Sequence, residues 1–195
     1  MLVELVIAMG LGLFLIAGLL SVMTHWLGAD GRLLARSHLT QELGNALALM
    51  RRDIGRAGYW GRVGDASDGV NGYEGIVAPE PGCLLYRYDH RGDDRNGVSS
   101  PDDMSGFRLK KGVLQYRTKN KACVRADCDR CDQGRWWALT DPKYLRVDAL
   151  EFRLLETRRE GLVTVRAVHI DLRGALVRSD VAAVTMSAVV LAGGE

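Results

Sequence analysis

The sequence predicts an α+β protein in which a long N-terminal helix packs on an antiparallel β-sheet. Two observations support this prediction. The chain contains no Asp, Glu, Lys or Arg between Leu5 and Ala29, so its first part is apolar all round. Its last part consists of runs rich in β-branched residues, which turns separate. A helix that must bury one face and a sheet that can cover it form a common two-layer architecture.

The apolar segment, residues 1–28, is long enough to cross a bilayer as one helix. A cleaved signal peptide is disfavoured, because the apolar run is too long and no basic residue precedes Arg32. We therefore expect a single-pass membrane anchor, with the rest of the chain outside the bilayer. Glu4 is unusual in this segment, because a carboxylate is costly inside a membrane.

Residues 29–61 continue the helix with an amphipathic pattern. Apolar side chains recur at steps of three and four, which is typical of a helix with one buried face. They are Leu39, Leu43, Ala46, Leu47, Met50, Ile54 and Ala57. Glycines at 55, 58 and 61 end the pattern, so one helix from residue 3 to about residue 56 is predicted.

Residues 62–195 are predicted to form a β-rich domain. Residues 62–106 are rich in Gly, Asp, Asn and Pro and indicate mostly loop, with a short strand at CLLYRY. The stretch FRLKKGVLQYRT alternates around Lys-Gly and predicts a hairpin. Four further strands are predicted, in RWWAL, LRVDALEFRLLET, LVTVRAVHIDLRG and DVAAVTMSAVVLA.

The first segment, LVELVIAMGLGLFLIAGLL, resembles the N-terminus of type IV pilins and of the pseudopilins of type II secretion. In those families the mature chain starts with a methylated Phe and carries Glu at the fifth position. Here the acid is the fourth residue, so we expect that the first mature residue is missing or replaced, or that the register differs by one.

A second stretch, ELGNALALMRRDIGRAGYWG, is similar to the helix end of PilW-type minor pilins. The residues of that helix-end motif are Arg56, Ala57, Gly58, Tyr59, Trp60 and Gly61. The J-type minor pseudopilin, which caps a secretion pseudopilus, has the same architecture and is the alternative within the class. A membrane-anchored enzyme or binding domain is the alternative outside it.

The resemblance implies a role in assembly. In pilins the apolar helices bundle in the filament core, where the acid, here Glu4, would meet the N-terminal amine of a neighbour and set the register. Small residues that would let helices pack closely are Ala8, Gly10, Gly12 and Gly18. The partners implied are other minor pilins, the major pilin and a tip adhesin. The chain would wait in the inner membrane and then enter the pilus, which serves adhesion and twitching motility.

Four cysteines, Cys83, Cys123, Cys128 and Cys131, lie beyond the anchor. Two structural disulfides are the favoured interpretation, and the spacing leaves all three pairings open. Free thiols, or one bridge with two thiols, are an alternative. Zinc is a weaker alternative, because no histidine lies nearby. Calcium at the Asp-rich loops around residues 89–103 and 127–132 is another, although neither loop matches an EF-hand. We expect no cofactor and no metal.

No catalytic motif was found, so an enzyme is not expected: the chain has no G-x-S-x-G, H-E-x-x-H or P-loop pattern. A basic stretch, residues 104–126, carries seven Lys and Arg residues together with Phe107 and Tyr116. Such a hairpin could bind DNA, but a solvated hairpin face is the favoured interpretation.

Overall fold

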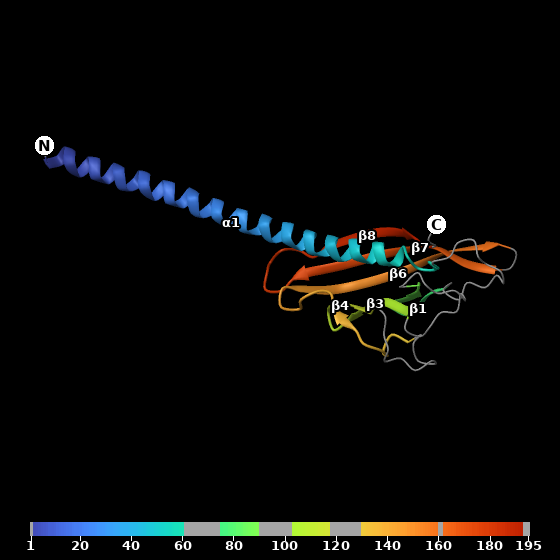
Figure 1. Ribbon diagram of the computed structural model, residues 1–195. Coiled ribbons are helices and arrows are strands. Elements are labelled where there is room, and N and C mark those ends of the chain that lie inside the picture. Colours follow the sequence, from blue (N-terminus) through green and yellow to red (C-terminus); the bar gives the residue numbers. More distant parts are fainter. Residues whose placement is uncertain (1, 61–74, 90–102, 118–129, 160–161, 193–195) are drawn as a thin grey trace. The chain divides into compact units, whose positions relative to one another are not determined.

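The computed structural model describes residues 2–60, 75–89, 103–117, 130–159 and 162–192 (Figure 1). Two compact units are present, Met1–His38 and Leu39–Glu195. The first consists of the N-terminal part of one helix. The second contains the rest of that helix and all of the described strands. The predicted α+β class is confirmed.

Helix α1 spans Leu2–Ile54. All seven residues of the predicted apolar stripe, from Leu39 to Ala57, are buried. The neighbouring positions that carry charge, such as Glu42, Arg51 and Arg52, are exposed. The 3.6-residue period of the helix therefore places one face of its second half against the β-strands, as predicted.

Sheet A is antiparallel and has the strand order β1-β2-β3-β4-β5. Its strands are β1 (Ile76–Glu80), β2 (Cys83–Arg87), β3 (Met104–Lys110), β4 (Val113–Arg117) and β5 (Trp137–Ala138). The predicted hairpin is β3–β4, whose two-residue turn is Lys111-Gly112. Both turn residues have positive φ angles (52° and 75°), as a type I′ turn requires.

Sheet B is antiparallel and has the order β6-β7-β8. Its strands are β6 (Leu145–Arg159), β7 (Leu162–Leu176) and β8 (Val184–Leu191). In Figure 1 strands β7 and β8 run beside the last part of α1, residues 39–54. Close approach at Gly174 of β7 permits this packing, because a Cβ atom there would lie 3.0 Å from Leu43 Cδ2 and 3.1 Å from the Arg146 carbonyl oxygen.

One hydrophobic core joins α1, sheet A and sheet B. It contains the α1 stripe, Tyr86 and Phe107 of sheet A, and Val168 and Ile170 of sheet B. A smaller cluster of buried residues surrounds the cysteines and contains Cys83, Leu85, Met104 and Cys131.

The described sheets differ from the prediction in three respects. The described strands form two sheets, whereas one was expected. Strand β1 lies in a stretch predicted to be loop. Its Pro and Glu residues are uncommon in strands, but β1 is an edge strand that pairs only with β2, where proline is tolerated. The predicted strand RWWAL is reduced to the two residues of β5, because only Trp137 and Ala138 pair with β4.

Candidate functional site

The first part of α1 is the candidate assembly site. Residues Leu2–Met23 have a mean hydropathy of 2.6, and no part of this stretch is buried within the chain. Its length and composition suit a membrane-spanning helix. Large side chains along it are exposed, for example Leu5 at 62% and Phe14 at 77%. So much apolar surface indicates that this helix is covered by lipid or by other chains.

The glycines of this segment face open space. A Cβ atom built on Gly10, Gly12 or Gly18 would meet nothing within 4 Å. Packing within the described chain therefore does not require glycine at these positions. Small residues are, in contrast, what allows two membrane helices to approach each other closely. Ala8 is exposed on the same segment.

Glu4 lies exposed in the first turn of α1. An acid at this end of a helix interacts favourably with the helix dipole, which stabilises the helix by about 0.3–1 kcal/mol. This local effect is a sufficient structural reason for an acid here. It does not explain why the acid stands at the head of a segment that is otherwise uncharged up to Ala29.

The far end of α1 is fixed to sheet A by a cluster of polar side chains. Asp53 accepts hydrogen bonds from the hydroxyl groups of Tyr86 (2.5 Å) and Tyr88 (3.1 Å). The two tyrosine rings are stacked, with centroids 6.2 Å apart. Both tyrosines are buried, so the hydrogen bonds form in a poorly solvated environment. The sequence signal for this cluster was YRY, which places two tyrosines on the same face of a strand.

The helix-end motif continues this connection through the backbone. The Gly58 N–H donates to the Arg87 carbonyl (2.8 Å), and the Asp89 N–H donates to the Tyr59 carbonyl (2.9 Å). Gly58 has a φ of 82°, a conformation that favours glycine. Ala57 is buried, Arg56 and Tyr59 are exposed, and Trp60 is half-buried. Gly61 lies outside the described residues.

Because of the two buried tyrosines, we expect the stability of the fold to decrease at alkaline pH. Burial, and then the charge of Asp53, raise the pKa of Tyr88 to about 12, and the same causes raise the pKa of Tyr86. In the unfolded chain both titrate near pH 10, so between about pH 10 and pH 12 the unfolded state loses protons that the folded state keeps. The contribution of the two tyrosines to the free energy of unfolding should therefore be fully present below pH 10 and decrease as the pH rises above 10.

Chemical unfolding measured from pH 8 to pH 12 tests this expectation. Tyr88→Phe should decline less steeply than wild type above pH 10, because one of the raised pKa values is removed. Tyr144→Phe is the matched control, because Tyr144 is 71% exposed. An identical decline in the two variants would contradict the role assigned to the cluster.

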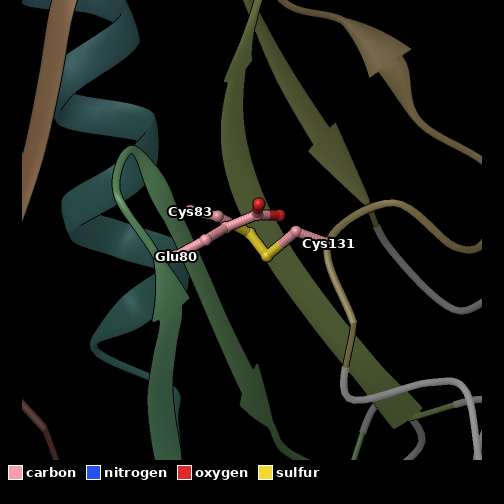
Figure 2. Close-up of side chains that lie close together, drawn as sticks. All are labelled: Glu80, Cys83 and Cys131. Atoms are coloured by element: carbon pink, nitrogen blue, oxygen red, sulfur yellow. A yellow bond between two sulfur atoms is a disulfide. The ribbon is translucent and has the colours of Figure 1, made fainter.

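The cysteine cluster lies against β2 and β3 of sheet A. Cys83 and Cys131 form a disulfide with Cα atoms 6.4 Å apart, and both residues are buried (Figure 2). Arg108 donates to the Cys131 carbonyl (2.5 Å), and its guanidinium lies 4.4 Å from the ring centroid of Trp136. The bridge thus joins β2 to the segment before β5. Cys123 and Cys128 lie outside the described residues.

A comparison with protein families decides the class of this chain. The model of one family, PpdB, prepilin peptidase-dependent protein B, matches residues 32–192. The chain belongs to this family. The match begins after the apolar segment, so it is independent of the N-terminal resemblance to pilins. No curated protein and no solved structure gave a significant match.

The PpdB family supports the pilin-like class in general. The protein is therefore a pilin-like PpdB-family member whose apolar N-terminal helix is a candidate membrane anchor. The match does not distinguish the PilW-type minor pilin from its relatives.

A metal site is not supported at Cys83 and Cys131, the two cysteines that the structure describes in this PpdB-family chain. Glu80, Cys83 and Cys131 bring potential ligand atoms within 4.8 Å of one another (Figure 2). Both sulfur atoms are, however, bonded to each other, and a metal-binding cysteine must be a thiolate. Of the aspartates considered for calcium, Asp132 pairs with Arg130 (2.9 Å), and Asp89 and Asp103 are buried. The others lie outside the described residues.

A second polar cluster lies on one face of sheet B. The Arg153 guanidinium donates to Asp171 (2.6 Å) and lies 3.0 Å from His169 Nδ1, and Ser187 donates to Asp171. The Ser187 hydrogen bond, followed by that of Arg153, lowers the pKa of Asp171. A nucleophilic serine requires a base that accepts its proton, commonly histidine. Here Ser187 faces the carboxylate, so the cluster does not have the arrangement of a catalytic triad.

Two residues of the basic stretch are not available for binding DNA. Phe107 and Arg117 are each only 1% exposed, so neither can stack on bases or contact phosphates. Arg117 instead donates to the Gln133 carbonyl (3.2 Å), and its guanidinium lies 5.0 Å from the ring centroid of Trp136. The sequence pattern could not show this, because Gln133 and Trp136 lie 16 and 19 residues further along the chain.

Proposed function

We propose that this chain is a minor pilin of the PilW type, which joins other minor pilins in a complex that primes assembly of a type IV pilus and stays at its tip. The proposal rests mainly on one observation, Glu4 at the head of an exposed apolar helix. Membership of the prepilin peptidase-dependent family supports it.

In this proposal the two parts of the chain have different tasks. The apolar half of α1 would hold the protein in the inner membrane and then enter the filament core. Once lipid is exchanged for neighbouring helices, a carboxylate must be paired, and the N-terminal amine of an adjacent subunit would provide the partner. The open space at Gly10, Gly12 and Gly18 would let neighbouring helices approach closely.

The β-rich domain would select the partners. No catalytic step is proposed for it. The core and the Asp53 cluster hold α1 firmly against sheet A, so a force on the helix would be transmitted to the domain. The major pilin, other minor pilins and a tip adhesin are the proposed neighbours. A J-type pseudopilin would use the same parts, and the subunits that co-purify with the chain would distinguish the two.

Replacing Glu4 tests this proposal. We expect Glu4→Ala to remain folded and membrane-anchored but to fall at least about tenfold in sheared filaments, because a charge pair between subunits is lost. Glu4→Gln should behave in the same way, because it keeps the size of the side chain and removes its charge.

Glu42→Ala is the matched control, since Glu42 is an exposed acid on the same helix. If Glu4 acts only on the helix dipole, its replacement would cost about 0.3–1 kcal/mol of helix stability and leave incorporation intact. Wild-type amounts of Glu4→Ala in sheared filaments would therefore contradict the proposed role.

A further inference from the structure

Strand β8 is an edge strand without the usual protection against pairing. Among the described strands it pairs only with β7, and its register with β7 is continuous over all eight residues. Its sequence, VTMSAVVL, contains no charge and no proline. Natural edge strands normally carry lysine, proline or a bulge that prevents addition of another strand.

The other edge of sheet B is protected. Strand β6 has two register shifts, between Val147 and Ala149 and between Leu155 and Glu156. Its Val147 N–H donates to the Gly112 carbonyl (2.9 Å), so the turn of the β3–β4 hairpin covers part of this edge. Four arginines and two glutamates also lie on β6. The two edges of one sheet thus differ, and only β8 is suited to accept another strand.

A groove runs between β8 and the second half of α1. Its volume is about 550 Å³, and it is lined by Ala48, Arg51, Arg52, Val189, Val190 and Leu191. Val189 is 50% exposed and Leu191 is 76% exposed. The groove therefore lies beside the unprotected edge and presents apolar side chains to solvent.

Two arginines give this groove a positive charge. Neither the Arg51 nor the Arg52 guanidinium pairs with a carboxylate in the part of the chain that the structure describes. The neighbouring Asp53 is already bonded to Tyr86 and Tyr88. Arginines in the last turn of a helix do interact favourably with its dipole. That effect accounts for positive charge at the helix end but not for its position beside an exposed apolar edge strand.

We propose that this site binds an extended segment of a partner protein in which apolar side chains alternate with carboxylates. The segment would pair with β8 through its backbone, the mode by which many sheets bind peptides. Its apolar side chains would lie against Val189 and Leu191, and its carboxylates would pair with Arg51 and Arg52. The inference does not depend on the proposed role in a pilus, because it rests on the end of α1 and on β8 and uses neither Glu4 nor the apolar segment.

Labelled synthetic peptides test the site directly. The full chain, held in phosphatidylcholine nanodiscs, is titrated with an eight-residue peptide of alternating Val and Glu or with a matched peptide of Val and Lys. We expect saturable fluorescence anisotropy for the Val/Glu peptide and binding at least about tenfold weaker for the Val/Lys peptide. Amide hydrogen exchange should slow in β8 and remain unchanged in β6.

Charge-reversed variants assign the binding to the groove. Arg51→Glu/Arg52→Glu should reverse the preference between the two peptides. Lys110→Glu/Lys143→Glu is the matched control, because it changes the net charge equally at exposed residues outside the groove. Val189→Lys, which introduces a charge on the edge strand, should weaken binding of both peptides.

Four results would overturn the proposal. The first is no saturable binding of the Val/Glu peptide up to about 1 mM. The second is an equal loss of binding in both charge-reversed variants. The third is protection of β6 in place of β8. The fourth is dimerisation of the chain through β8, which would make a second copy the occupant.

Discussion

Replacing both Cys83 and Cys131 by alanine is expected to lower the free energy of unfolding by about 4 kcal/mol. The disulfide joins positions 48 residues apart in sequence, so its removal restores much conformational freedom to the unfolded chain. Both cysteines are also buried in the cluster around Leu85 and Met104, and the loss of the sulfur atoms would leave unfilled space.

Urea unfolding of the full chain in detergent, followed by tryptophan fluorescence, measures this effect. Trp136 packs against the cysteine cluster and should report its loss. The single variant Cys83→Ala should be destabilised by a similar amount, because either substitution alone breaks the bridge. A free energy of unfolding within about 1 kcal/mol of wild type in the double variant would contradict a stabilising role for the bridge.

Replacing Leu43 by alanine is expected to cost about 3–4 kcal/mol. Leu43 is fully buried on the α1 stripe, and its side chain lies against Gly174 of β7. The substitution removes three heavy atoms from the middle of the interface between helix and sheet. Leu43 belongs to the core that α1 forms with the two sheets, and such close-packed surroundings relax only partly, so we expect the cavity to remain unfilled.

The matched control is Leu33→Ala on the same helix. Leu33 is 67% exposed, so its truncation should change the stability of the β-rich domain by less than about 0.5 kcal/mol. Helix propensity changes equally in the two variants, because both replace leucine by alanine. Equal destabilisation by both would show that the stripe does not hold α1 in place.

The elements with a regular local pattern could be predicted from the sequence. The α1 stripe repeats at steps of three and four, and every residue assigned to it is buried. The β3–β4 hairpin is predicted by alternation around Lys111-Gly112. In both cases the residues that decide the structure are close together in the chain, so periodicity and turn chemistry are sufficient.

The division into two sheets and the cysteine pairing depend on distant segments and could not be predicted. Spacing alone left three pairings of the four cysteines open, whereas the fold places Cys83 of β2 beside Cys131. Strand β1 was missed because its sequence, IVAPE, has few strand-forming residues and depends on β2 for its structure.

The candidate sites also differ in whether their residues are close together in the sequence or come from distant segments. Glu4 and the glycines of the apolar segment belong to one continuous motif, so the resemblance could identify them. The groove combines residues 48–52 with residues 189–191, which only the packed domain brings together. The Asp53 cluster likewise joins the helix end to β2 across more than thirty residues.

Mass spectrometry of filaments sheared from the cells that make this protein tests the central claim most directly. The account predicts that the chain is found in these filaments with other pilin-like subunits, and that its N-terminus is trimmed and methylated. An unprocessed chain that occurs only in the membrane fraction would contradict it. The protein would then be an anchored domain with a different function.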